Sequence, residues 1–379
     1  MLCFYFQQLG LSYHISFATL GLLVLFLLEH KNISYNNTIN AFAVAASIII
    51  LLIINLAEIG YSSEYLRIIR VSFCAFILFL LINRTNYLPL PNNKLFFSLI
   101  VGLLAIVFYQ ILIDPSLQIP SIYFSGLENL GDLENSINPI NLINLPTYTL
   151  RTNGIFSEPS YLGMMLSCIY LFLLNSNNYL KRNTKYILII LIIIAILISG
   201  SGIGIFSLII ISIYYLRINK FKNFIPIVII LFLLFIFIKT IQSSVDISFS
   251  LLERFVDSGS EFDHSSEVRF FNPFLLIADN LYHGKLFGVL LNNYDYYLRT
   301  GLYLSEEDFP MHNGVINLII MYGFFGIWYI LKLAKNLNST DEYIIVLTIG
   351  MQNGSFFSYE KVFLIIYVVY TLRSFKKLK

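Results

Sequence analysis

One polar run stands out in an otherwise apolar chain, Arg151-Thr-Asn-Gly-Ile-Phe-Ser-Glu-Pro-Ser-Tyr-Leu-Gly163. Ser157 is a favourable N-cap residue, and Pro159 fits the first turn of a helix, where its missing N–H costs nothing. Glu158 then lies at the positive end of the helix dipole, which favours the ionised carboxylate. A carboxylate close to Arg151 at a membrane boundary suits chemistry on an anionic, lipid-linked substrate. The simpler interpretation is that Glu158 only caps a membrane helix.

A second polar segment, Pro310-Met-His312-Asn313-Gly314, opens another apolar run. We place His312 in the first turn of a helix, where the helix dipole disfavours the protonated ring. A neutral imidazole near pH 7 is what a general base requires. Asn317 follows one turn later and could orient the ring or face another helix. The alternative is that His312 is an ordinary interfacial residue.

Three arginines could bind phosphate groups. Arg151, Arg254 and Arg269 each carry a guanidinium that presents parallel donors to phosphate and keeps its charge in a dry site. Together they could hold a diphosphate leaving group. Alternatively, Arg254 beside Glu253 and Arg269 near Glu267 form exposed ion pairs that contribute little.

The elements that must position these residues are membrane helices. The 379 residues are 57% hydrophobic and only 12% charged, and the mean hydropathy is +0.75. Repeated apolar runs of about 20 residues are typical of a multi-span helical membrane protein. We therefore predict an all-α, polytopic fold with about eleven (ten to twelve) transmembrane helices. The predicted spans are 10–28, 39–57, 65–83, 95–113, 159–175, 184–199, 202–216, 224–241, 312–331, 342–353 and 359–373.

Basic residues of the short connections fall on one predicted side, which the positive-inside rule makes cytoplasmic. They include Lys31, Arg84, Lys94, Lys181, Arg182, Lys185, Lys332, Lys335 and the basic tail that ends at Lys379. The C-terminus is therefore predicted in the cytoplasm, and an odd number of spans places the N-terminus outside.

Two long segments remain on the outer face of a single membrane domain that covers residues 1–379. The first is 114–158, and the second and larger one is 242–311. Within the second, residues 270–282 have the spacing of an amphipathic helix, which could lie along the membrane surface and cover a site. Segments of this length usually bind or catalyse.

Several common chemistries leave no trace in the sequence. There is no phosphate-binding Gly-Lys-Ser/Thr loop, no Cys/His zinc spacing and no His-Glu-x-x-His motif. Cys3, Cys74 and Cys168 all lie in apolar segments, so we expect core residues rather than disulfides. Ser199-Gly-Ser-Gly-Ile-Gly204 lies between two spans, and we interpret it as a tight turn with close helix packing.

The order of these motifs resembles the Wzy-type O-antigen and capsule polymerases, which are related to the O-antigen ligases. The motifs are the Arg151–Gly163 run, the Ser-Ser-Glu-Val-Arg run that ends at Arg269, Gly288, His312-Asn313, Gly323 and Gly326. The resemblance covers about 151–331, and the first four spans match only in hydropathy. The Glu-Pro-Ser element at a span start favours a polymerase over a ligase. The chain departs from the pattern in two places: Ser199–Gly204 lacks an arginine often found there, and a Gly-x-Gly motif is reduced to Gly288.

The resemblance implies a GT-C-like glycosyltransferase of the bacterial inner membrane that needs no metal or other cofactor and whose site faces the periplasm. Its substrates would be oligosaccharides linked to undecaprenyl diphosphate. The protein would also contact the surrounding membrane lipid. Glu158 or His312 would be the catalytic base, and Arg151, Arg254 and Arg269 would bind the diphosphate. The supporting residues would be Tyr161, Asn313 and Asn317. A chain-length regulator and a flippase of the same pathway are the expected protein partners, and no nucleic acid is expected.

Two alternative functions remain from the sequence. An O-antigen ligase would use the same chemistry with lipid A core as the acceptor. A flippase or other transporter of lipid-linked glycans would carry charged residues deep in many spans, and few are seen here. For the polymerase, we expect Arg151, Glu158, Arg269 and His312 to share one cavity.

Overall fold

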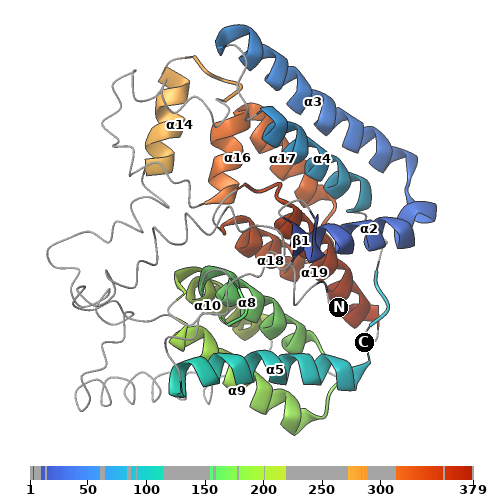
Figure 1. Cartoon of the computed structure of the whole chain (residues 1–379), viewed down its shortest axis with the longest axis vertical. Coiled ribbons are helices and arrows are strands. Elements are labelled where there is room, and N and C mark those ends of the chain that lie inside the picture. Colours follow the sequence, from blue (N-terminus) through green and yellow to red (C-terminus); the bar gives the residue numbers. More distant parts are fainter. Residues whose placement is uncertain are drawn as a thin grey trace, which may run out of the picture. The chain divides into compact units, whose positions relative to one another are not determined.

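A computed structural model describes residues 3, 10–12, 15–59, 65–82, 87–90, 92–113, 154–156, 159–176, 179–199, 201–218, 272–282, 284–288, 313–352 and 355–377. In these ranges the regular secondary structure is helical apart from one antiparallel pair of short strands, β1 (Gly10–Ser12) and β2 (Ile15–Ser16) (Figure 1). The all-α prediction is therefore confirmed for the helical body of the protein.

The chain forms two compact units. Unit 1 comprises residues 1–97, 172–181 and 264–379, and unit 2 comprises residues 98–171 and 182–263. Because the long segments 114–153 and 219–271 lie outside the described residues, the boundaries predicted for the two outer segments remain predictions.

The N-terminal helices of unit 1 are α2 (Phe17–Glu29), the short 3-10 helix η1 (His30–Asn32), α3 (Tyr35–Ile59) and α4 (Tyr65–Leu81). The prediction that the first span starts at residue 10 is wrong, since residues 10–16 include the two strands. The helix starts at Phe17 because Ser16 caps it, with its Oγ accepting from Thr19 N at 3.3 Å. Helices α3 and α4 pack along each other, with Asn37 Nδ2 donating to Leu80 O at 3.5 Å.

The C-terminal helices of unit 1 are α14 (Asn272–Tyr282), α16 (Gly314–Tyr322), α17 (Phe324–Lys335), α18 (Thr340–Gly350) and α19 (Tyr359–Lys377). The single span predicted over 312–331 is interrupted at Gly323, whose φ of 53° and ψ of −127° only glycine adopts readily. Hydropathy is continuous across this break, so the sequence pattern alone did not reveal it.

Unit 2 contains α5 (Asn93–Leu112) from Ser98 onward, α8 (Pro159–Asn175) up to Leu171, α9 (Arg182–Ile198) and α10 (Gly202–Ile218). These helices start and end within two residues of the predicted spans. Cys168 in α8 is fully buried, as is Cys74 in α4 of unit 1, and both are free thiols as predicted.

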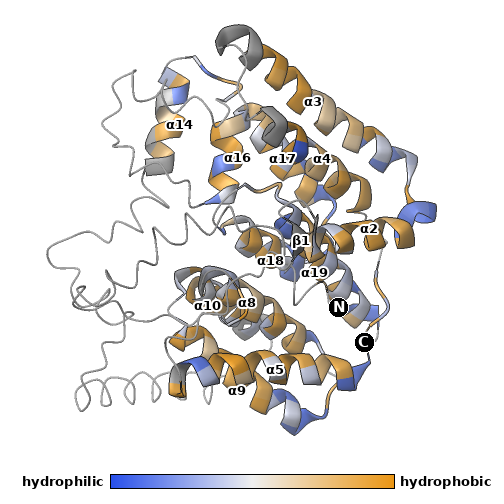
Figure 2. Cartoon of the chain, in the orientation of Figure 1, coloured by the Kyte–Doolittle hydropathy of each residue, from blue (hydrophilic) through white to orange (hydrophobic). Residues whose placement is uncertain are grey.

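Most residues of the helices are hydrophobic, and hydrophilic residues occur mainly near the helix ends (Figure 2). Among the described residues, two helical stretches are long and apolar enough to cross a membrane, Tyr35–Ile54 and Asn93–Gln110. Shorter apolar helices are Ile69–Leu81, Ser160–Asn175 and Gly202–Tyr215. The span predicted at 224–241 lies outside the described residues, so the total of about eleven stays a prediction.

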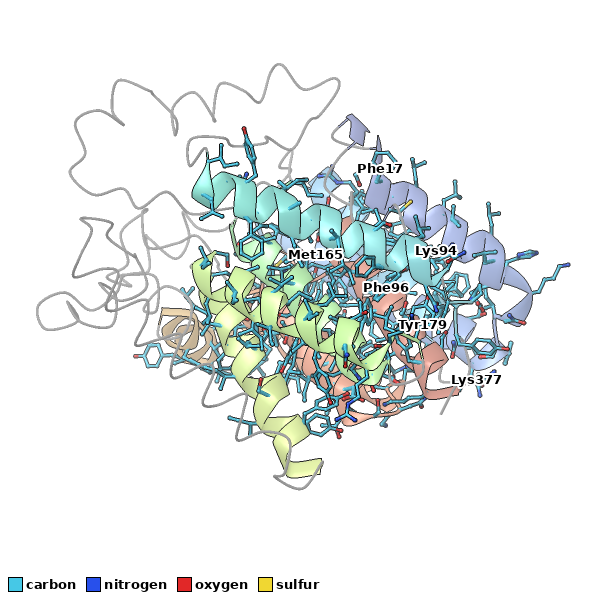
Figure 3. The ribbon with its side chains drawn as sticks, turned by 90° about the horizontal axis from the view of Figure 1, so that it is seen from below. Phe17, Lys94, Phe96, Met165, Tyr179 and Lys377 are labelled. Carbon is cyan, nitrogen blue, oxygen red and sulfur yellow. The ribbon has the colours of Figure 1, made fainter. Side chains whose placement is uncertain are left out.

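Aromatic side chains join several connections at one end of unit 1. The Tyr179 ring lies 5.7 Å from the Phe96 ring and 5.4 Å from the Phe375 ring, measured between centroids. Lys377 Nζ lies 3.2 Å from the centroid of the Tyr87 ring. Figure 3 shows Phe96, Tyr179 and Lys377 from below. The start of α5, the residues before α9 and the end of α19 therefore meet.

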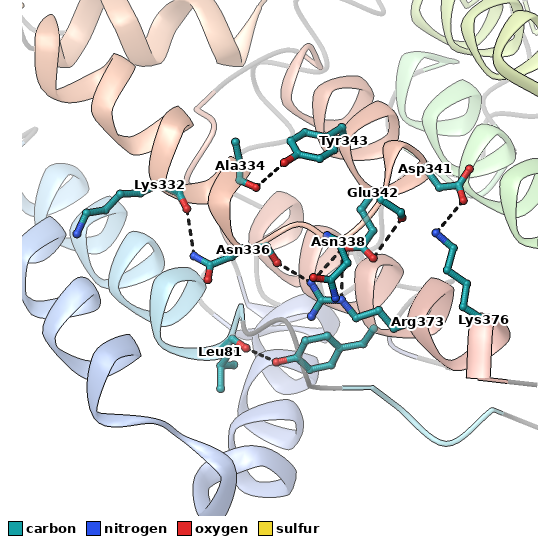
Figure 4. Close-up of polar contacts among 12 residues, drawn as sticks. Leu81, Lys332, Ala334, Asn336, Asn338, Asp341, Glu342, Tyr343, Arg373 and Lys376 are labelled. Carbon is teal, nitrogen blue, oxygen red and sulfur yellow. Dashed lines mark hydrogen bonds and ion pairs between the residues drawn. The ribbon is translucent and has the colours of Figure 1, made fainter.

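A buried ion pair fixes the same end of unit 1 (Figure 4). Glu342, fully buried in the first turn of α18, accepts hydrogen bonds from Arg373 Nη2 at 3.0 Å and Arg373 Nε at 3.3 Å. Arg373 Nη2 also donates to Asn336 O at 2.8 Å, and Lys376 pairs with Asp341 at 3.0 Å. These contacts tie α19 to the connection between α17 and α18.

Candidate active site

The first motif begins with a tight turn that a buried glutamine holds. Gly154 has a φ of +62°, which confirms the predicted turn at this glycine. Gln110, near the end of α5, donates from Nε2 to Gly154 O at 3.1 Å and accepts from Gly154 N at 2.9 Å. Helix α8 then begins at Pro159, as the sequence predicted. Arg151 and Glu158 lie outside the described residues.

Helix α8 packs tightly against α10 through small residues. A Cβ at Gly163 would lie 3.0 Å from the Cα of Gly204, so the two backbones are in contact. Ser167 Oγ donates to Gly163 O at 2.7 Å and lies 3.5 Å from Gly204 O. This confirms the predicted close packing after the Ser199–Gly204 turn. Tyr161, in the first turn of α8, is partly exposed.

The second motif forms the N-terminus of α16. Asn313 is the N-cap, with its Oδ1 accepting from Val315 N at 3.2 Å and from Ile316 N at 3.3 Å. The helix therefore starts at Gly314, and His312 precedes the cap instead of lying in the first turn. His312 itself is outside the described residues, and Asn317 is buried within α16.

A lysine that the sequence analysis did not single out lies beside this helix start. Lys361, in the first turn of α19, is buried, and its Nζ donates to Gln352 O at 2.6 Å. Gly314 N donates to the same carbonyl oxygen at 3.1 Å. The start of α16 is thereby fixed to the connection between α18 and α19, with a lysine side chain as one of the two donors.

The predicted amphipathic helix exists as α14, and it packs against α16 (Figure 1). Asn280, buried near the C-terminal end of α14, donates from Nδ2 to Ile320 O at 3.3 Å. Six residues further along the chain, Leu286 O accepts from Phe324 N at 3.1 Å. The C-terminal ends of α14 and α16 therefore meet, and Figure 1 shows the two helices side by side and running in the same direction.

Two glycines of the motif make this contact. A Cβ at Gly288 would lie 2.5 Å from the carbonyl carbon of Met321 and 2.6 Å from Gly323 N. Gly288 has a φ of +79° and Gly323 a φ of +53°. The structure thus brings together Gly288 and Gly323, which the sequence had linked only by their order along the chain, at the break between α16 and α17.

The charged candidates are outside the part of the chain that the structure describes. Arg151, Glu158, Arg254, Arg269 and His312 keep their roles as predictions, and the cavity expected to unite four of them is untested. Within the described residues, no three His, Cys, Asp or Glu side chains group as a metal ion would require.

Sequence reasoning overlooked Gln110 and Lys361, the residues that fix the two helix starts. The available signal was a polar side chain at the edge of an apolar run, near the end of 93–112 for Gln110 and, beside Glu360, near the start of 359–375 for Lys361. Placing a polar residue in a membrane costs free energy, so such residues tend to have a specific hydrogen-bond or ion-pair partner.

A family model described as WcaD colanic acid polymerase matches residues 1–374. The chain belongs to this family. No curated protein and no solved structure matches the sequence. This match includes the first four predicted spans, which contain none of the motifs and had resembled the Wzy-type polymerases only in hydropathy.

Membership establishes a membrane-embedded polysaccharide polymerase of the Wzy type. The protein joins lipid-linked repeat units, which is a glycosyltransferase activity, and this confirms the function predicted from the motifs. The polymerase is therefore selected over the ligase and the transporter. The family is named for colanic acid, an exopolysaccharide, so a specific assignment to lipopolysaccharide is not supported.

Proposed function

We propose that this polymerase works in the bacterial inner membrane, with its site facing the periplasm, on repeat units carried by undecaprenyl diphosphate. An acceptor sugar hydroxyl attacks the anomeric carbon of the growing glycan. The new glycosidic bond forms as the bond from carbon to diphosphate oxygen breaks, and the hydroxyl proton passes to a base. The glycan is proposed to be an exopolysaccharide of the class that names the family.

In this proposal, Glu158 or His312 takes the proton, because each occurs near the start of an apolar helix that borders a long polar segment. Arg151, Arg254 and Arg269 stabilise the negative charge that develops on the departing diphosphate. Asn313 supports the site by capping α16, and Asn317 and Tyr161 lie in α16 and α8, the helices that follow the two candidate bases in the sequence.

The parallel packing of α14 and α16 is the observation that carries the proposal. Arg269 is three residues before the start of α14, and His312 is two residues before the start of α16. Because the two helices run the same way (Figure 1) and are joined at their C-terminal ends, their N-terminal ends lie on the same side. The positive ends of two neighbouring helices favour a bound diphosphate, and they disfavour protonation of a nearby imidazole, which keeps it available as a base.

The test compares R269A and E158Q with the control R182A in cells that lack the chromosomal gene. Both site variants should reach the membrane at wild-type levels but leave single repeat units on the lipid carrier, with polymer reduced at least about 100-fold. Arg182, exposed at the start of α9 and predicted on the opposite side, should be replaceable without loss. Normal polymer length in both site variants would refute the assignment of these residues.

The protein partners are also proposed from the pathway. A flippase must deliver the lipid-linked unit to the side where it is polymerised, and a chain-length regulator would set when the product is released. Co-purification of either protein with the detergent-solubilised polymerase, compared with an unrelated membrane protein as bait, would test these associations.

A further inference from the structure

A single polar side chain lies near the end of the apolar helix α5. Gln110 is 1% exposed, and the buried residues that precede it on the same helix are apolar, including Leu103 and Val107. Burying an amide costs free energy unless its donors and acceptor are satisfied. Gln110 forms two of its hydrogen bonds with a residue that is far away in the sequence, Gly154.

The contact between Gln110 and Gly154 has two hydrogen bonds. Gln110 Nε2 donates to Gly154 O at 3.1 Å, and Gly154 N donates to Gln110 Oε1 at 2.9 Å. Both backbone groups of one residue are thus bound by one side chain, which fixes the orientation of the peptide as well as its position. A single hydrogen bond would constrain the orientation of this peptide less.

Packing confines the same turn between two helices. A Cβ at Gly154 would lie 3.3 Å from Cδ1 of Leu162 in α8 and 3.5 Å from Cγ2 of Val107 in α5. The next aromatic residue, Phe156, is 1% exposed. Only Ser157 and Glu158 separate Phe156 from Pro159, where α8 begins.

We infer that Gln110 is a positioning residue for the segment that carries Glu158. Its amide holds the Gly154 turn at one end of a short connection whose other end is fixed by α8. The inference rests on the proposed function, in which the Glu158 carboxylate accepts a proton or otherwise acts on the substrate. A displacement of about 1 Å at a reacting group can lower turnover about 100-fold.

The experiment uses the full-length polymerase, reconstituted in liposomes and supplied with a lipid-linked repeat unit. Q110M keeps the side-chain length but removes both hydrogen bonds, and Q110E keeps the acceptor for Gly154 N while removing the donor to Gly154 O. For Q110M we expect kcat to fall about 10- to 100-fold with KM within about threefold. Q110E should lie between Q110M and the wild type.

The matched control is Y170F. It removes another buried hydrogen bond of unit 2, the 3.1 Å contact between Tyr170 OH and Ser212 Oγ, which does not involve the Gly154 turn. Y170F should keep wild-type kcat, although it loses a bond of similar kind. Equal losses of kcat in Q110M and Y170F would mean that Gln110 only stabilises the unit, which would overturn the inference.

A double variant separates this inference from the proposed function. If Gln110 acts through Glu158, then Q110M should lower kcat little further when E158Q is already present. If the fold reductions in kcat caused by Q110M and E158Q multiply in the double variant, the inference is overturned, whereas the role of Glu158 is unaffected. Wild-type turnover in E158Q would refute the role of Glu158 itself. If Q110M fails to accumulate in the membrane, the same comparison is made with Q110E.

Discussion

Glycine residues at two positions allow the backbone contacts around the break between α16 and α17. Gly288 and Gly323 both have positive φ, and each leaves space that the backbone of the other segment fills. A side chain at either position would meet peptide atoms, which cannot move aside as a flexible side chain can. The lack of side chains at these two glycines therefore allows the segment after α14 to approach the end of α16 closely.

At position 323, substitution by alanine should be strongly destabilising. G323A would place its Cβ 2.6 Å from Gly288 N, in addition to the cost of about 1–2 kcal/mol for a left-handed backbone with a side chain. We expect less folded protein in the membrane and short or absent polymer. Thermal unfolding of the detergent-solubilised protein measures the first effect, and gel analysis of the glycan the second.

The control for G323A is G102A. Gly102 lies within the apolar helix α5, and a Cβ there would have no heavy atom within 4 Å. Alanine is favoured over glycine in a helix by about 0.5–1 kcal/mol, so G102A should be neutral or slightly stabilising. Equal stability of G323A and G102A would show that the Gly288 contact is not formed in the membrane.

Predictions for single residues succeeded where the residue type itself favours a particular local backbone conformation. Gly154 predicted a turn and Pro159 a helix start, and both are found. Gln110 and Lys361 were overlooked because their roles depend on the partners Gly154 and Gln352, not on local sequence. One polar residue in an apolar run has no periodicity, and its partner cannot be identified before the fold is known.

Helices were predicted well where one apolar run corresponds to one helix. The prediction for α8, 159–175, matches its observed bounds, and α9 and α10 agree within two residues. The failures occur where local backbone conformation overrides hydropathy. Gly323 interrupts a continuous apolar run, and the two short strands occupy residues that read as the start of the first span.

The buried pair of Glu342 and Arg373 should make a measurable contribution to the packing of α18 on α19. Removing one partner leaves a buried charge without its counterion, which typically costs about 3–5 kcal/mol. We expect E342L and R373M each to lower the midpoint of thermal unfolding. The double variant E342L/R373M should be less destabilised than the sum of the two, because no charge is left unpaired.

An exposed basic residue provides the comparison for this cycle. Lys31 lies exposed in η1, and K31M should change stability by no more than about 0.5 kcal/mol. Strictly additive effects of E342L and R373M would contradict the prediction, since they would mean that the two side chains do not interact in the folded protein.

At the scale of the whole molecule, contacts in unit 1 bear on the orientation predicted from charge. Four parts of the chain meet at one end of this unit: Tyr87, Tyr179, the connection that contains Asn336, and the end of α19 at Lys377. All four were placed on the cytoplasmic side by their basic residues. Contacts between side chains cannot bridge a bilayer of about 30 Å, so these segments share one compartment.

Reporter fusions test both the grouping and its orientation. Green fluorescent protein, which fluoresces only when it folds in the cytoplasm, should be bright when fused after residues 90, 180, 338 and 379. Alkaline phosphatase, which is active only in the periplasm, should be active when fused after Leu112, because α5 starts among the basic residues near Lys94 and ends across the membrane.

If the four positions disagree with one another, the contacts at that end of unit 1 are wrong. If all four agree but report the periplasm, the fold stands and the orientation is reversed, which would move the proposed catalytic residues to the cytoplasmic face and exclude a periplasmic polymerase.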